Sequence, residues 1–401
     1  MVQKEIAPNL SYHYWYLGIQ GLELDEEADP LVLVRGSEFN HEREIEMEDD
    51  EGHMGTATTR MSSYRTTATA NPSFSDKCRY KEGWEDIWLL LLGSAKGGDG
   101  SDKDDIRKET VTTGVYKYTF KVNTDHPQDP YFCNLVNGFA KTEDDAYRYD
   151  NCLLSEFECS GSNEEAPTYT ATFSSNYPRV NQANPARVIP ARTVFPKSAD
   201  VSVYIAPQGQ LTTSNMTNYE YPCYLEWSFN VNNNLESVPC SGDEFGESTK
   251  VLGNREGEVS ITVPWTNATK FLEKEFETGS FDPESDSNPT TVTTENDEKT
   301  IWFVMKNGTI GETEYKYQTT IKIPQVVITS AYSEQSGTDA KQIELQGNIE
   351  ENGQDSFIEV EIITDLENLH IDNTVGTEGS AYDTSDNETT EETNTTEPSS
   401  P

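Results

Sequence analysis

Apolar and polar residues alternate along much of the chain, and this period of two is typical of β-strands with one buried and one exposed face. The clearest example is Glu256–Val263, in which apolar residues or glycine at odd positions alternate with polar residues at even positions. Valine, threonine and aromatic residues recur in such segments and favour strands, so a mainly β protein is expected. The pattern predicts strands over residues 16–24, 31–39, 42–48, 115–122, 156–161, 168–175, 199–207, 224–231, 255–263, 299–305, 317–332 and 356–364, and residues 62–74 take the place of a further strand in the order of elements.

Two segments, residues 82–94 and 267–280, change from this alternation to the hydrophobic spacing of a helix. Each ends at a glycine, which is the residue most often found just after the last helical turn. We expect each helix to bury its apolar face against a sheet or the end of a barrel. The predicted core contacts of the two helices are Trp84, Trp88, Leu91, Leu272 and Phe276.

The two halves of the chain carry these elements in the same order, which indicates an internal duplication. We predict a first β domain over residues 1–190 and a second over residues 191–375, each with one flanking helix. The proline-containing segment 181–198 is the expected linker. Residues 376–401 contain almost no apolar residue, and we predict a disordered acidic tail rich in threonine and serine.

The polar faces of the alternating strands are acidic or neutral. The sequence leaves two interpretations open: an ordinary solvated sheet, or a sheet whose wet side lines a water-filled bore. The residues on these polar faces, and hence the candidates for such a lining, are Glu42, Glu44, Glu46, Glu48, Glu226, Ser228, Asn230, Glu256, Glu258, Ser260 and Thr262.

The chain has 71 acidic and 29 basic residues, a formal net charge of −42. A surface this negative repels phosphate backbones, so tight binding of nucleic acid is not expected. One explanation is a high-salt environment, in which dense carboxylates keep the surface hydrated and salt screens their repulsion. The other is a soluble acidic protein without such adaptation, and the scarcity of lysine favours the first.

The sequence contains no pattern that predicts catalysis. It lacks a phosphate-binding loop, a nucleophile elbow and the histidine spacing of a zinc site, so we predict no enzyme, no metal and no cofactor. The six cysteines form no C-x-x-C pair and are expected to be free thiols. We recognise no signal-peptide core and no run long enough to span a membrane. The sequence therefore predicts a protein that is made and assembled inside a cell and does not associate with a membrane.

Three segments resemble the tail tube, or major tail, proteins of long-tailed viruses of bacteria and archaea. They are Leu225–Val263, with its G-x-R-E-x-x-x-S-x-T-V run from Gly253, the helix at 267–276, and the helix, loop and strand of Glu82–Asn123. The resemblance covers roughly residues 15–370. One departure is residues 62–74, which contain a proline and match the family pattern poorly.

The resemblance implies two tandem tail-tube domains, each a β-sandwich or barrel with a flanking helix. It implies homotrimeric, pseudo-hexameric rings in which inner strands of all copies close into one barrel. Strands with the acidic faces described above would line its lumen. The loops at residues 49–60 and 240–252 would contact the next ring.

The function implied is that of a structural virion protein whose stacked rings form a tube with an acidic lumen for DNA ejection. Its partners would be further copies of itself, a tape-measure protein in the lumen, terminator and distal tail proteins at the tube ends, and DNA in transit. Localisation would be the virion tail, after assembly in the host cytoplasm. The acidic composition extends this expectation to a halophilic host and a haloarchaeal virus.

Two alternatives remain at this level. A secreted or cell-surface β-sandwich glycoprotein, such as an adhesin, would use the N-x-[ST] sites, two of which lie in the tail at Asn387 and Asn394. An acidic β-rich hydrolase or lectin would need a convergent site that the sequence does not reveal.

Overall fold

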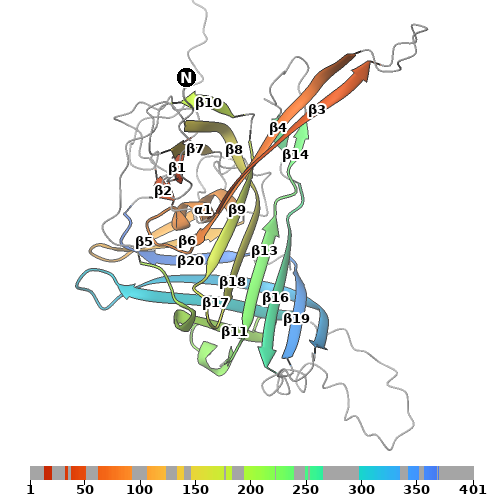
Figure 1. Cartoon of the computed structure of the whole chain (residues 1–401). Helices are drawn as coiled ribbons and strands as arrows, with labels where there is room; N and C mark the ends of the chain where they lie inside the picture. Colours follow the sequence, from red (N-terminus) through yellow and green to blue (C-terminus); the bar gives the residue numbers. More distant parts are fainter. Residues whose placement is uncertain are drawn as a thin grey trace, which may run out of the picture.

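A computed structural model confirms the mainly β prediction, with strands in antiparallel pairs and a single α-helix among the residues that it describes (Figure 1). Eighteen strands form one hydrogen-bonded network, and β14 and β15 form a separate hairpin. The structure describes residues 13–19, 32–34, 38–50, 62–92, 106–122, 133–139, 146–175, 178–182, 194–221, 223–238, 249–251, 253–264, 298–334, 342–351, 356–367 and 369.

Eight strands in the order β3-β4-β9-β8-β13-β16-β19-β18 form one sheet, which we call the central sheet. Every neighbouring pair in it is antiparallel. Its strands are β3 (Glu38–Asp50), β4 (Ser62–Lys77), β8 (Ala146–Ser162), β9 (Thr168–Ser174), β13 (Glu226–Asn232), β16 (Glu256–Pro264), β18 (Lys316–Glu334) and β19 (Gln342–Ile349).

Two long strands, β8 and β18, leave the central sheet and continue into flanking sheets. The first flanking sheet has the order β2-β1-β7-β8-β10, and the second has the order β12-β11-β17-β18-β20-β6-β5. Strands of the second flanking sheet cross behind those of the central sheet (Figure 1). The remaining elements are β1 (His13–Ile19), β2 (Val32–Val34), α1 (Trp84–Leu92), β5 (Ile106–Thr112), β6 (Val115–Lys121), β7 (Cys133–Phe139), β10 (Arg179–Gln182), η2 (Ser198–Asp200), β11 (Val201–Pro207), η3 (Met216–Asn218), β12 (Glu220–Tyr221), β14 (Glu236–Val238), β15 (Thr249–Val251), β17 (Glu298–Thr309) and β20 (Glu359–Thr364).

Strand pairing repeats between the two halves in the same order. In the first half the pairs are β1–β2, β1–β7, β7–β8, β8–β10, β3–β4, β4–β9 and β8–β9. In the second half the matching pairs are β11–β12, β11–β17, β17–β18, β18–β20, β13–β16, β16–β19 and β18–β19. Each half therefore contributes one equivalent four-stranded unit to the central sheet.

A β-bulge recurs at equivalent places in the two long strands. Ser155 of β8 lies between residues paired with β9, and its hydroxyl donates to the carbonyl of Thr172 at 2.9 Å. Thr329 of β18 lies at the corresponding bulge against β19, and its hydroxyl donates to the carbonyl of Gln346 at 3.2 Å. This shared detail aligns the two units residue by residue, because a bulge fixes the local register of a strand pair.

The hydrophobic core fills the space between the central sheet and the second flanking sheet, and α1 lies inside it. The sequence predicted a helix with one buried face, yet all nine residues of α1 are buried because sheet strands cover its other sides. Trp88 is the centre of an aromatic cluster, with ring centroids 4.9 Å from Phe157, 6.3 Å from Phe229 and 5.3 Å from Trp84. The predicted contact Leu91 is also fully buried.

A chain of hydrogen bonds connects α1 to the second half of the molecule. The indole Nε1 of Trp84 donates to the hydroxyl of Thr319 at 3.0 Å, and that hydroxyl donates to Tyr80 at 3.2 Å. Tyr80 in turn donates to the carbonyl of Met305 at 3.3 Å. Each polar group of this buried chain has a partner, so it orients the helix without the cost of an unpaired group.

The two halves share one continuous core. Strand β8 pairs with β13 across the predicted boundary, and β6 of the first half pairs with β20 of the second. The division into domains 1–190 and 191–375 stays a prediction. Most of the linker, the helix at 267–280 with Leu272 and Phe276, and the tail 376–401 lie outside the described residues.

Several predicted strand boundaries were wrong. The prediction for residues 31–39 merged β2 with the start of β3, and the sequence interpretation missed β7 and β19. Residues 62–74 do form strand, as part of β4, although they contain Pro72. The continuous ladder from β4 to β9 begins at Ser73, so the missing amide of Pro72 interrupts no pair of that ladder.

Replacing Trp88 with alanine tests the role of the aromatic cluster. Removing this fully buried indole should lower the free energy of unfolding by about 3–5 kcal/mol, because it leaves a cavity between three aromatic rings. Urea unfolding measures this change. Val111→Ala is the control, because Val111 in β5 is 37% exposed, and its effect should stay within about 0.5 kcal/mol. Equal effects of both substitutions would contradict this description of the core.

Candidate functional site: the polar face of the central sheet

One face of the central sheet packs on the core. The other is polar where it is described, apart from Pro264 at one strand end and from Leu153 and Val327, where β8 and β18 leave the sheet. Trp227, Phe229 and Val231 of β13 are buried, whereas the residues between them are half-buried or exposed. The same alternation continues on β4, β9, β8, β16 and β19. We call this surface the polar face; its described polar residues are Asn71, Ser73, Ser75, Lys77, Glu156, Glu158, Ser160, Ser162, Thr168, Thr170, Thr172, Ser174, Glu226, Ser228, Asn230, Asn232, Glu256, Glu258, Ser260, Thr262, Gln342, Glu344, Gln346 and Asn348.

The carboxylates of the polar face are never directly opposite one another in the described registers. Glu158 and Glu258 both pair with Asn230, so one amide separates them. Glu226 lies between Ser162 and Thr262 in the same way. Like charges directly opposite would destabilise a sheet, and this spacing of two strands, about 10 Å, keeps the face negative at lower cost.

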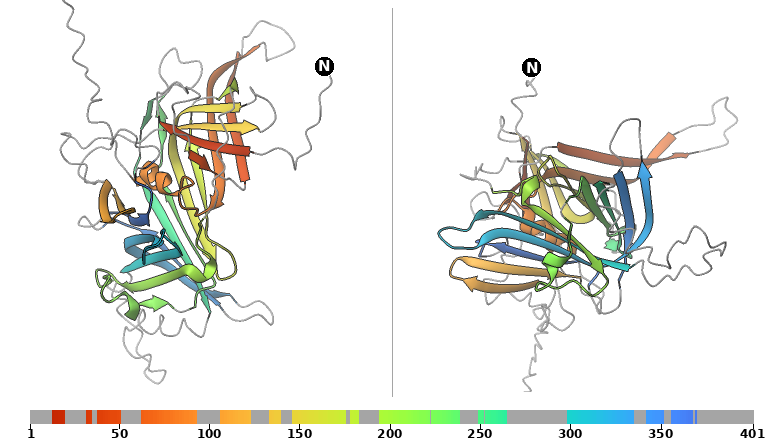
Figure 2. Two further views of the ribbon diagram at one scale, coloured as in Figure 1. Left: turned by 90° about the vertical axis from the view of Figure 1, so that its left-hand side faces the viewer. Right: turned by 90° about the horizontal axis from the view of Figure 1, so that it is seen from below.

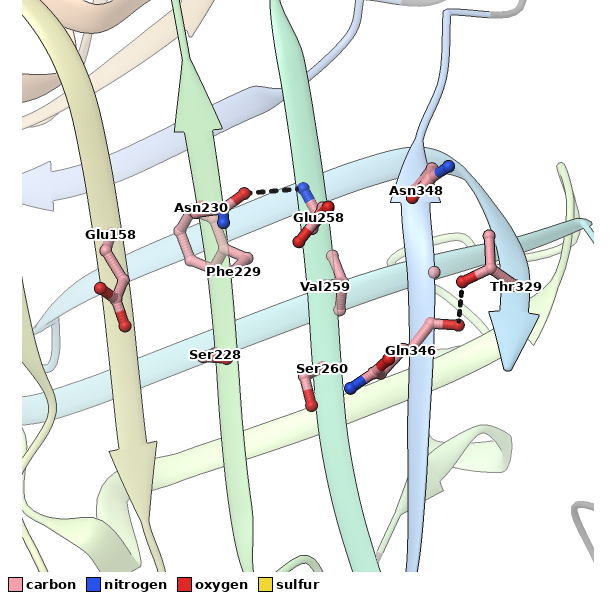
Figure 3. A pocket seen from close by; sticks show the side chains of 11 residues that line it. Glu158, Ser228, Phe229, Asn230, Glu258, Val259, Ser260, Thr329, Gln346 and Asn348 are labelled. Carbon is pink, nitrogen blue, oxygen red and sulfur yellow. Dashed lines mark hydrogen bonds between the residues drawn. The ribbon is translucent and has the colours of Figure 1, made fainter. Parts of the chain in front are cut away.

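Hydrogen bonds tie the neutral residues of the polar face to its carboxylates and backbone. The hydroxyl of Ser260 and the amide of Gln346 both donate to Glu344 at 2.9 Å. Asn230 accepts from the backbone amide of Glu258, also at 2.9 Å (Figure 3). The surface has two shallow depressions of ≈ 170 and ≈ 420 Å³, both lined mainly by polar residues of neighbouring strands.

Cations are nearly absent from the polar face. Among its described residues the single cation is Lys77, at the end of β4, and its Nζ lies 5.0 Å from the centre of the Phe195 ring. In the described registers, no lysine or arginine is directly opposite a carboxylate of the face. The excess of carboxylates over cations gives the described face a negative potential, which ionic strength screens.

The second flanking sheet has a different character, because two of its carboxylates, Glu359 and Glu361, are paired with lysines. Glu359 of β20 lies 2.7 Å from Lys322, and Glu361 lies 2.6 Å from Lys117. Burial alone would raise the pKa of Glu359, but hydrogen bonds and charge from Lys121 and Lys322 lower it below its usual value. The molecule thus has carboxylates paired with lysines on one sheet, and on another carboxylates whose neighbours in register are neutral.

Seven of the predicted lining residues lie on the polar face, on the neighbouring strands β13 and β16; they are Glu226, Ser228, Asn230, Glu256, Glu258, Ser260 and Thr262. The predicted β3 residues belong to the same sheet, since Glu42, Glu44 and Glu46 pair in register with Asn71, Thr69 and Thr67 of β4. Glu48 pairs with Tyr64 beyond a bulge. The side chains of these four glutamates lie outside the described part of the structure.

Sequence interpretation missed the contributions of β8, β9 and β19 to this face. Glu156 and Glu158 lie in a segment predicted as strand, yet nothing in the sequence placed that strand beside β13. The strand carrying Glu344 and Gln346 was not predicted at all. Its alternation of Ile343, Leu345 and Ile349 was a usable signal, interrupted by Gly347.

Both outer edges of the central sheet are unpaired among the described residues. Strand β3 pairs with β4 alone, and β18 beyond residue 328 pairs with β19 alone. Exposed strand edges present free backbone donors and acceptors and readily add further strands.

The β3–β4 ribbon extends well beyond the neighbouring strands of the central sheet, and β14 lies towards the same end (Figures 1 and 2). Strand β15 lies within residues 240–252, which the sequence predicted to be a loop, and it pairs with β14, which precedes that segment. Residues 51–61 and 239–248, which hold most of the two loops predicted to contact another ring, lie outside the described residues.

No family model and no curated protein matches this chain. The helix within the described residues is too short to cross a membrane, and no group of three metal-ligating side chains was found in the same residues. Of the cysteines described, Cys78, Cys133, Cys152 and Cys159 are buried free thiols, and Cys223 is an exposed one.

Replacing Glu359 with glutamine tests the paired charges of the second flanking sheet. The native carboxylate has a lowered pKa, so its stabilisation is present above the unfolded-state value, about 4.3, and is lost as the pH falls through the folded-state value. The variant should be about 1–2 kcal/mol less stable at pH 7 and equal to the native protein in acid. Chemical unfolding at several pH values measures this difference. Glu312→Gln, in an exposed turn, should show none; a pH-independent loss in the Glu359 variant would contradict the charge pairing.

Proposed function

We propose that this protein is a structural subunit of a viral tail tube, and that the polar face lines the channel through which DNA passes. The observation that carries the proposal is the polar face itself: a broad sheet surface with glutamates in regular spacing and a single described cation, at its end. The absence of a described catalytic or metal constellation leaves this surface as the main candidate for function.

The chemistry of the polar face suits a conduit better than a binding site. Phosphate-binding surfaces concentrate lysine and arginine, and a lining of the same sign as DNA weakens adhesion. Serine, threonine, asparagine and glutamine between the carboxylates hold water, so a passing duplex would contact a hydrated layer. DNA would then slide without a strong stationary complex.

The asymmetry of charge supports a role beyond salt tolerance. Adaptation to high salt would place unpaired carboxylates on every exposed surface. Instead, the second flanking sheet pairs Glu359 and Glu361 with lysines, whereas the described polar face has a single lysine, Lys77, at its end. We infer that DNA passage accounts for the polar face and that a saline environment accounts for acidity elsewhere.

Ring assembly follows from the open edges of the central sheet. A closed barrel leaves no edge for aggregation, and a head-to-tail contact between copies closes a ring. The resemblance to tail tube proteins favours three copies per ring, with rings stacked through the ends of the β3–β4 and β14–β15 ribbons. Tape-measure, terminator and distal tail proteins are the proposed further partners, in a virion tail.

Electron microscopy of the purified, concentrated protein in high salt tests this function. We expect rings with a central hole and stacks of such rings. The contradicting result would be a protein that stays monomeric across salt and protein concentrations, and glycans on such a monomer would favour the cell-surface alternative.

Reversing charge on the polar face should convert the channel into a DNA-binding surface. With Glu158→Lys and Glu258→Lys together, assembled protein should co-sediment with linear duplex DNA at low salt and release it as salt rises. Glu312→Lys with Glu314→Lys is the matched control, because it makes the same charge change at an exposed turn. The control and the native assembly should leave DNA in solution. Equal DNA retention by both variants would count against a lining role.

A further inference from the structure

We propose that β18 of one copy pairs with β3 of the next copy, in the register that β8 and β13 use inside a single chain. This inference rests on the proposed assembly and identifies its contact. The β8–β13 pair within one chain is the model for this contact, because β8 is the last strand of the first four-stranded unit and β13 is the first strand of the second. The equivalent last and first strands, β18 and β3, are the two strands with open edges.

The recurring bulge gives the residue correspondence on the β8 side of this junction. Ser155 corresponds to Thr329, since both hydroxyls donate to the carbonyl opposite the bulge. Counting onward along the strands, the residues Glu156, Glu158 and Ser160 of β8 correspond to Ser330, Tyr332 and Glu334 of β18.

Register gives the correspondence on the β13 side. The two carbonyls opposite the bulges belong to Thr172 and Gln346, which pair with Ser73 and Ser260 respectively. Ser73 then pairs with Asn40, and Ser260 pairs with Ser228. Asn40 of β3 therefore corresponds to Ser228 of β13.

Applying the β8–β13 register to the corresponding residues of β18 and β3 gives the residue pairs between two copies. Ser228 pairs with Ser160, Asn230 with Glu158 and Asn232 with Glu156. The equivalent pairs between two copies are Asn40 with Glu334, Glu42 with Tyr332 and Glu44 with Ser330.

The spacing of charges supports this register independently. In it, each of the three β3–β18 pairs places a glutamate opposite a neutral residue, and no two carboxylates are opposite one another, as in the described polar face. A slip of two residues in one direction would pair Glu42 with Glu334, and a slip in the other would pair Glu38 with Glu334. Both slips put like charges directly opposite, which destabilises antiparallel sheets. A slip of one residue would place core-facing residues of β3 opposite polar-face residues of β18, so the two faces would not continue from one copy to the next.

Strand direction also permits the contact. Directions alternate across the eight strands of the central sheet, so β3 and β18 run in opposite directions. A β18 edge placed beside the β3 edge of another copy is therefore antiparallel, like every other pair in the sheet. The same contact repeated around a ring would produce one closed barrel.

Disulfide cross-linking between copies tests the register. In a background with Cys223 and Cys240 replaced by serine, Glu42→Cys with Tyr332→Cys should convert assembled protein into covalent oligomers under copper–phenanthroline oxidation. A non-reducing gel should then show loss of the monomer band. Glu42→Cys with Ala331→Cys, one residue out of register, is the matched control and should stay monomeric. Equal cross-linking of both pairs, or none in the in-register pair, would overturn the proposal.

Mixing two singly substituted proteins, Glu42→Cys and Tyr332→Cys, gives a second measurement that does not depend on the double variant folding. Oxidation of the mixture should produce dimers and no longer oligomers, because each copy then carries one cross-linking position. Tubes that form normally without these dimers would overturn the register while leaving the tube function intact. A protein that forms no rings would overturn both.

Discussion

The pairing of β8 with β13 is the interaction on which the whole molecule depends. It joins two four-stranded units, one from each half of the chain, into a single sheet with one face packed on the core, which we call the dry face, and the polar face, or wet face, on the other side. An antiparallel sheet of this width has two costs, an apolar face to cover and two edges to satisfy. Within the chain, the flanking sheets and α1 cover the apolar face. The two edges stay unpaired among the described residues of one copy, and we propose that other copies pair with them.

The two faces of the central sheet divide the work of stability and function. On the dry face, Trp88, Phe157 and Phe229 form a continuous aromatic cluster that fixes the sheet against the helix. This packing leaves the wet face free of any structural need for charge pairs, so its composition can serve another purpose. Glutamates separated by hydroxyl and amide residues give a negative, hydrated surface without direct repulsion between neighbouring strands.

The sequence predicted the mainly β class and the polar face of β13 and β16, because alternation over Glu226–Asn232 and Glu256–Pro264 is nearly perfect. It also predicted α1, although not that the helix is buried on all sides. Alternation carries no information about which strands are neighbours, so the placement of Glu158 beside Asn230 could not be predicted. The strand with Glu344 escaped notice because Gly347 interrupts its apolar series, and the pairing of β6 with β20 links segments too distant for any local pattern.

A three-dimensional reconstruction of the assembled protein by electron cryo-microscopy tests the central claim most directly. The account predicts a continuous barrel around a hollow axis, with the rows of Glu158, Glu258 and Glu344 facing the hole and the lysines of the second flanking sheet outside. An assembly in which these glutamates face outward, or are buried between copies with no channel beside them, would contradict it.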